Sequence, residues 1–241
     1  MTTSTIIILL LFASGAAFIQ RTTGFGFGIF IMTMLPYLMP SYGEATTLSG
    51  LLAAVTSLTI VMRYRKHLEW SKLLPILTVF LVVSSFAVHL LSLLASATLH
   101  TVLGIMLIAA ALYFWFFAGR LTVKPNIATQ MSLGTLSGFM GGLFGMQGPP
   151  AVLYFLQVSK TKEGYAVLAQ AYFLIGNIVM TIYRAHEGFL TPTVLSSWCI
   201  ALPGVALGTV VGGLAFSRLS MPLLRKIVYI YIGISGVLAL L

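Results

Sequence analysis

The sequence predicts an all-α polytopic membrane protein made of two inverted repeats of five hydrophobic segments each. Of its 241 residues, 59% are hydrophobic and 7% are charged, and the mean hydropathy is +1.05. Such a chain has too few polar residues to cover a water-exposed surface, and runs such as 73–95 are apolar on all sides. A transmembrane β-barrel instead needs short stretches of alternating polarity. We therefore expect residues 1–241 to form a single transmembrane domain.

Ten apolar segments follow one another along the chain. The first half contains 4–20, 24–39, 45–62, 73–95 and 98–118, and the second contains 127–140, 143–158, 165–182, 191–216 and 221–241. The first run lacks the basic residues that begin a signal peptide, so we expect it to be a retained helix.

An internal repeat orders these segments. Shifting the chain by 119 positions aligns YRKH at 64–67 with YRAH at 183–186, and Gly26 with Gly145. This agreement predicts a duplicated half, with repeat 1 at 1–120 and repeat 2 at 125–241. Because five is an odd number, the two copies would cross the membrane in opposite directions, as in inverted-repeat transporters.

The basic residues give an independent prediction of topology. The positive-inside rule places the cluster at 63–72 in the cytoplasm, and counting crossings from there puts both termini outside. On that count Arg184, beside Glu187, falls outside. A parallel arrangement of four plus four helices would put Lys160 and Lys162 outside, so five plus five is preferred.

The first two segments of each half are short. Sixteen helical residues reach roughly 24 Å, less than the roughly 30 Å hydrocarbon core. Each pair is therefore either two thin spans or a re-entrant hairpin whose turn lies at membrane depth.

Both short pairs meet at glycine-rich stretches, RTTGFGFG at 21–28 and MGGLFGMQGPP at 140–150. Non-helical backbone at membrane depth is tolerated where it is buried or lines a wet cavity. Three features of these stretches favour binding of an anion. Glycines can expose backbone N–H groups, and the N-terminus of a half-helix attracts anions. The planar guanidinium group of Arg21 is suited to binding oxyanions. The candidate substrate-binding residues are Arg21, Thr22, Thr23, Gly24, Gly26, Gly28, Gly142, Gly145, Gln147 and Gly148. The alternative is that the glycines pack helices together and Arg21 is a cytoplasmic anchor.

Three polar residues within the apolar runs have two readings each. His89 is the candidate proton relay, or else an interior histidine with its hydrogen bonds satisfied. Gln170 and Asn177 could reach a cavity, or bond to a neighbouring helix. The glycines at every fourth position of 204–213 predict a helix-packing face.

The two glycine-rich stretches, the duplicated half and the chain length resemble the sulfite exporter TauE/SafE family of membrane transporters. The residues that carry the resemblance, over essentially the whole chain, are Gly24, Gly26, Gly28, Pro36, Gly138, Gly141, Gly142, Gly145, Gly148 and Pro149. Family members have denser glycine runs, which Phe25, Phe27, Phe144 and Met146 interrupt here. The resemblance implies secondary transport, usually export, of sulfite, sulfonates or related small sulfur-containing anions across a bacterial inner membrane.

The residue inventory argues against several other classes. The chain has no Asp, which disfavours an intramembrane enzyme, and no GxxxxGK phosphate-binding loop, which disfavours nucleotide-driven transport. It has one cysteine, Cys199, which disfavours a cysteine metal site.

We expect no cofactor, metal or nucleic acid. The expected partners are a small anionic substrate and the lipid bilayer, and a homo-oligomer stays open. The alternatives are a transporter of another small anion, an uptake permease and a structural assembly subunit.

Overall fold

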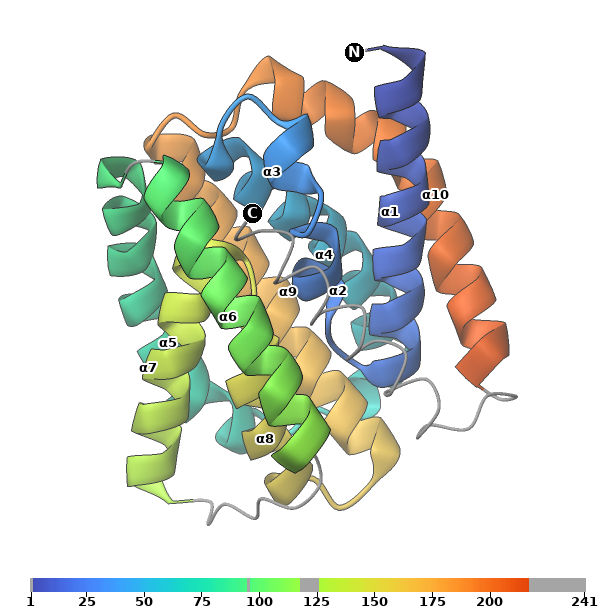
Figure 1. The fold of residues 1–241 in the computed structure, drawn as a ribbon. Helices are drawn as coiled ribbons and strands as arrows, with labels where there is room; N and C mark the ends of the chain where they lie inside the picture. Colours follow the sequence, from blue (N-terminus) through green and yellow to red (C-terminus); the bar gives the residue numbers. More distant parts are fainter. Residues whose placement is uncertain (1, 95, 118–125, 217–241) are drawn as a thin grey trace.

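A computed structural model describes residues 2–94, 96–117 and 126–216 (Figure 1), which form helices joined by turns, with no strand among them. The helices are α1 (Thr3–Thr23), α2 (Phe27–Ile31), α3 (Leu35–Leu38), α4 (Tyr42–Tyr64) with the 3₁₀ turn η1 (Arg65–His67), α5 (Trp70–Leu93), α6 (Ser96–Phe117), α7 (Ile127–Phe144), α8 (Gly148–Val158), α9 (Lys162–His186) and α10 (Pro192–Phe216). The predicted segment 221–241 lies outside the described residues. The all-α class is confirmed.

Five of the described helices are long and apolar enough to cross a membrane: α1, α4, α5, α9 and α10. Their outer faces carry large exposed apolar side chains, such as Val82 and Phe86 on α5 and Leu207 and Val210 on α10. Such faces are suited to contact with lipid tails rather than water. The chain is therefore a multi-pass membrane protein, as the sequence predicts.

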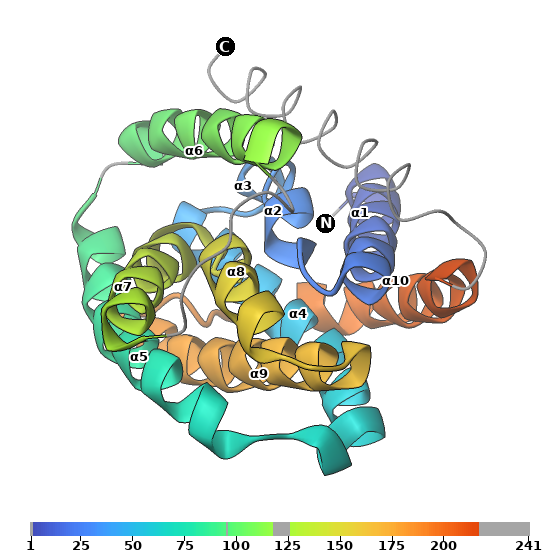
Figure 2. The same cartoon turned by 90° about the horizontal axis from the view of Figure 1, so that it is seen from below.

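Helices α4 and α9 pack against each other and form the centre of the molecule. About 61% of the apolar window of each is buried, against 33% for α1 and α10. On one side α1 packs along α10, and on the other α5 packs along α7 (Figures 1 and 2). The first helix of each predicted half thus packs on the helix of the fourth segment of the other half. Two halves related by a two-fold axis would pair in this way, although the inverted repeat itself stays a prediction.

The contact between α10 and α1 depends on the glycine face at 204–213. A methyl group added at Gly204 would stand 2.6 Å from the carbonyl oxygen of Leu10, and one added at Gly208 would overlap the carbonyl oxygen of Ser14. The two helix backbones therefore touch, which is the role that the spacing of these glycines predicts.

The short second segment of each half is not one spanning helix. α1 runs to Thr23 and α7 to Phe144, so the first helix of each half is longer than the sequence suggests. The second segment of the first half is divided between α2 and α3, and α8 has 11 residues, or roughly 16 Å. Each of these helices is too short to cross a hydrocarbon core of about 30 Å.

The predicted topology can be tested by labelling single cysteines in a Cys199→Ser background. The connection between α4 and α5, which contains Lys66, and the connection between α8 and α9, which contains Lys160, lie at one end of the molecule, and the turn between α9 and α10, with Glu187, lies at the other (Figure 1). We expect cysteines at 66 and 160 to react with a membrane-impermeant reagent only from the cytoplasmic side, and one at 187 only from outside. Labelling of position 160 from outside would contradict the five-plus-five arrangement.

Candidate substrate site between two glycine-rich turns

Each predicted half turns back on itself at a glycine-rich turn, which we call tip 1 (residues 24–28) and tip 2 (residues 145–148). Gly24 and Gly26 have φ angles of 85° and 96°, and Gly145 has a φ of 68°. This left-handed region costs a residue with a Cβ atom about 1–2 kcal/mol. Gly24 ends α1 and Gly145 ends α7, each with its N–H 2.9 Å from a carbonyl oxygen one turn earlier. The glycines are therefore required by the turn geometry itself.

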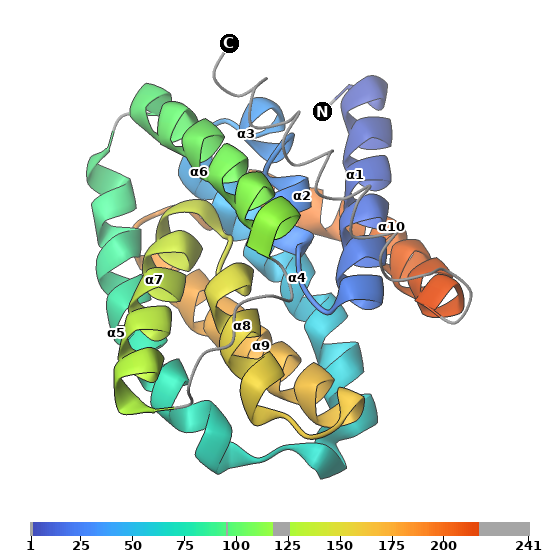
Figure 3. The same ribbon diagram turned by 60° about the horizontal axis from the view of Figure 1, so that its bottom comes forward.

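The two tips, more than a hundred residues apart in sequence, touch in the interior. A Cβ atom on Gly28 would overlap the carbonyl oxygen of Gly145, so the two backbones are in direct contact. Helices α2 and α8, which follow the tips, lie inside the bundle between the α1–α10 pair and the α5–α7 pair (Figure 3). The turns of the two halves thus meet inside the bundle.

Both tips line one cavity of about 30 Å³, which has room for about two water molecules. Its lining residues come from α1, tip 1, α2, α4, tip 2 and α9: Gln20, Phe25, Gly26, Phe27, Gly28, Ile29, Ala53, Gly145, Met146, Gln147, Gly148, Phe173 and Asn177. Among them are three amide side chains and no charged group. The site is thus a small neutral polar cavity.

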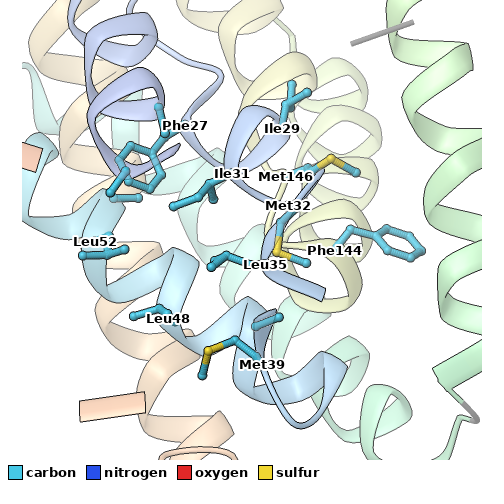
Figure 4. Close-up of a cluster of buried hydrophobic side chains, with 14 of the residues drawn as sticks. Phe27, Ile29, Ile31, Met32, Leu35, Met39, Leu48, Leu52, Phe144 and Met146 are labelled. Atoms are coloured by element: carbon cyan, nitrogen blue, oxygen red, sulfur yellow. The ribbon is translucent and has the colours of Figure 1, made fainter. Parts of the chain in front are cut away.

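One side of the cavity merges into a buried apolar cluster. Phe27 and Ile29 of α2 belong to the same cluster as Phe144 at the end of α7 and Met146 of tip 2, as Figure 4 shows. In a membrane such packing excludes both lipid and water from the contact between the tips.

Tip 1 is held by a buried hydrogen-bond network from α1, α4 and α9. Gln20 Nε2 donates to Ser57 Oγ at 2.9 Å and to Gln170 Oε1 at 2.7 Å, and Ser57 Oγ donates to the same Oε1 at 2.9 Å. Gln170 Nε2 donates to the carbonyl oxygen of Gly24 at 2.7 Å. Gln20 lines the cavity, and its Oε1 atom is buried without a hydrogen-bond partner.

Tip 2 is held by a second network. Gln147 Nε2 donates to Asn177 Oδ1 at 2.9 Å, while the carbonyl oxygen of Gln147 accepts from Ser137 Oγ at 2.6 Å. Tyr172 Oη donates to Ser137 Oγ at 2.8 Å. The Oε1 atom of Gln147 is also buried without a partner. Because the two ends of an amide differ in hydrogen-bonding character, rotation of these side chains can offer either donors or acceptors to a ligand.

Five of the ten candidate substrate-binding residues line this cavity, and the other five do not. The five that line it are Gly26, Gly28, Gly145, Gln147 and Gly148. Thr22 and Thr23 instead donate back to the carbonyl oxygens of α1, including that of Ile19. Gly142 packs against α5, where an added Cβ atom would stand 2.9 Å from the carbonyl oxygen of Ser84.

The remaining two of these five are Arg21 and Gly24. The Arg21 side chain lies against α10, with its Nε atom 3.6 Å from the position that a Cβ atom on Gly213 would occupy. Gly24 takes part through the carbonyl oxygen that Gln170 binds. In this conformation Arg21 therefore contacts the α1–α10 interface and not the cavity.

His89, the candidate proton relay, lies away from the cavity at the end of α5 near the turn after α9. Its Nδ1 atom is 2.9 Å from Oε1 of Glu187, and about 60% of its side chain is exposed. Hydrogen bonds with His89 and Ser92 lower the pKa of Glu187. This pair links the two predicted halves at the surface.

Sequence reasoning missed the buried charge of Arg184 and the amide of Gln20, and it left Gln170 and Asn177 open between a cavity and a neighbouring helix. Arg184 was expected in an outside connection, but α9 continues to His186 and the Arg184 side chain is completely buried. Gln20, Gln170 and Asn177 turn out to hold or line the tips. For Gln170 and Asn177 the signal was a polar residue within an apolar run, which is uncommon in a membrane span unless the residue has a partner or a function.

Comparison with known proteins agrees with this architecture. The model of the family described as "Sulfite exporter TauE/SafE" matches residues 8–239. A curated protein of Cupriavidus necator, described as a probable sulfite/organosulfonate exporter TauE, is 26% identical over 231 residues, which is 92% of this chain and 89% of that protein. No solved structure matches the chain. Since the family model covers nearly all of the sequence, the chain belongs to the TauE/SafE sulfite exporter family of membrane transporters.

Proposed function

We propose that this protein exports sulfite, organosulfonates or related small sulfur-containing anions across the bacterial inner membrane, and that the anion binds between tip 1 and tip 2. The observation that carries the proposal is that glycine-rich turns from both halves line a single cavity. The family membership and the name of the Cupriavidus relative support the substrate class.

The lining of the cavity suits a small oxyanion. The amides of Gln20, Gln147 and Asn177 offer N–H donors, and no lining side chain carries a negative charge. The N-terminus of α8 begins at the cavity and contributes the positive end of its dipole. Pro149 and Pro150 have no N–H, so the N–H of Gly148 is the backbone donor at this helix start.

Alternating access accounts for the arrangement of the helices around the cavity. Because the tips touch and the cavity is small, an anion needs the tips to separate before it can enter or leave. The pairs α1–α10 and α5–α7 each contain one helix from repeat 1 (1–120) and one from repeat 2 (125–241), so the units that move against each other are these mixed pairs. Transport of another small anion and uptake instead of export are the alternatives, and substrate flux separates them.

Flux into and out of proteoliposomes tests the proposal. We expect sulfite and a small organosulfonate to move faster than in protein-free liposomes, and a neutral solute of similar size to show no acceleration. Movement of sulfate alone would indicate another anion, and no accelerated anion flux in either direction would contradict the proposal.

The same assay tests proton coupling. A proton relay through His89 stays a prediction, and it requires that His89→Gln abolish the stimulation of flux by a pH gradient. Glu187→Gln is the matched control, because it removes the partner of His89 but leaves the imidazole in place. Unchanged gradient-driven flux in His89→Gln would remove His89 from the pathway.

A further inference from the structure

Arg184 is a completely buried cation in the last two turns of α9, where it holds the end of α7. Its Nη2 atom donates to the carbonyl oxygens of Gly141 and Gly142 at 2.9 and 3.1 Å, and its Nη1 atom donates to that of Thr46 at 3.1 Å. The carbonyl oxygen of Gly141 also accepts from the N–H of Gly145, whereas Gly142 belongs to the last carbonyl groups of a helix, which lack partners within it, so Arg184 stabilises the end of α7.

The charge of Arg184 is not neutralised by any carboxylate that the structure describes within ion-pair distance. Glu187, the acidic residue nearest in sequence, pairs with His89, and the Nε atom of Arg184 is buried without a partner. A neutral amide could cap carbonyl groups with a far smaller cost of desolvation. A capping role accounts for the hydrogen bonds, but it does not account for the presence of a charge.

The guanidinium lies directly behind the wall of the cavity. A Cβ atom added to Gly50 would stand 3.3 Å from Nη1 of Arg184 and 3.5 Å from Oδ1 of Asn177. Asn177 lines the cavity, and the end of α7 that Arg184 holds leads into Gly145 of tip 2. The distances of 3.3 and 3.5 Å place Nη1 of Arg184 no farther than their sum from Oδ1 of Asn177, a residue that lines the proposed anion site.

We propose that Arg184 is the residue that makes the cavity selective for anions. Arg184 does not line the cavity and attracts the anion through its electric field from behind Asn177. The field reaches the anion because a charge in a dry protein interior is weakly screened. This inference rests on the proposed function and names the source of charge selectivity at the same site. The neutral amides and backbone groups then orient the anion, and Arg184 supplies the attraction.

Replacing Arg184 tests the inference. We expect Arg184→Gln to raise the KM for sulfite flux by at least about tenfold, because it removes the charge and keeps hydrogen-bond donors. Arg184→Lys should keep the KM within a few-fold of the parent, because the charge remains. Arg63→Gln, which removes a surface cation at the end of α4, is the control and should leave the KM unchanged. An unchanged KM in folded Arg184→Gln would overturn the inference and leave Arg184 as a helix cap.

A second pair of variants keeps Arg184 in place, in case its replacement prevents folding. Gly50→Asp sets a carboxylate beside the guanidinium, and Gly50→Asn sets a neutral group of the same shape there. We expect the KM for sulfite to be at least about tenfold higher in Gly50→Asp than in Gly50→Asn, because only the carboxylate neutralises Arg184. Equal KM values in the two variants would contradict the inference.

These experiments separate the inference from the proposed function. If the parent protein transports neither sulfite nor an organosulfonate, the proposed function is refuted. Transport by the parent, together with an unaltered KM in Arg184→Gln and equal KM values in the Gly50 pair, refutes the role of Arg184 alone.

Discussion

Replacing Gly28 by alanine is expected to abolish most of the anion flux while leaving the bundle folded. The added methyl group would overlap the carbonyl oxygen of Gly145, so tip 1 and tip 2 must move apart. Overpacking of this kind costs about 1–3 kcal/mol of stability. Here it weakens the contact between tip 1 and tip 2, which closes the cavity. We expect at least a tenfold loss of sulfite flux per folded molecule, measured in proteoliposomes.

Gly188→Ala is the control for this variant. Gly188 has a φ of 82°, so alanine there is strained by about 1 kcal/mol, but no atom lies within 4 Å of the added carbon and the residue lies outside the cavity. We expect it to lower the thermal unfolding temperature slightly and to preserve flux. Flux in Gly28→Ala equal to that of the parent would show that contact between the tips is not needed for transport.

Replacing Gly208 by alanine is expected to be among the most destabilising single-methyl changes in this protein. From the sequence alone it looks like a mild change on a packing face, but the structure shows that the methyl group would overlap the carbonyl oxygen of Ser14 in α1. Because α1 and α10 are in backbone contact, neither helix can yield without being displaced along its length. We expect a loss of about 2–3 kcal/mol in the free energy of unfolding and a lower unfolding temperature in detergent.

Gly213→Ala is a matched control on the same helix. Its methyl group would meet Arg21 at 3.6 Å, an ordinary van der Waals distance. We expect its unfolding temperature to stay close to that of the parent. Equal unfolding temperatures for Gly208→Ala and Gly213→Ala would mean that α1 and α10 are not held in close backbone contact.

The placement of Arg21 and Arg184 shows what a linear pattern leaves undecided. Both are single cations near the end of an apolar segment, and the sequence favours Arg21 because it begins the glycine-rich stretch 21–28. In the folded chain Arg21 lies against α10, whereas Arg184 is buried behind Asn177. The direction in which a residue at a helix end points depends on the neighbouring helices, which periodicity does not reveal.

Local chemistry alone determined much of the rest. The scarcity of charge dictates helices in a membrane, because backbone groups without water must be hydrogen-bonded within their own segment. The positive φ angles at Gly24, Gly26 and Gly145 follow from turns that residues with a Cβ atom adopt only at a cost, and the glycine face at 204–213 follows from its spacing. These properties depend on residues that are close together in the chain, and a single sequence displays them directly.

Tertiary structure alone decided that the two tips share one cavity, and which side chains reach it. The contact between Gly28 and Gly145, the amides of Gln20 and Asn177, and the burial of Arg184 join segments far apart in sequence. Such contacts depend on the pairing of α1 with α10, of α5 with α7 and of α4 with α9. Apolar helix faces in lipid resemble one another in composition, so the choice of partner is made by the fit of backbones and small side chains, which exists only once the helices have packed.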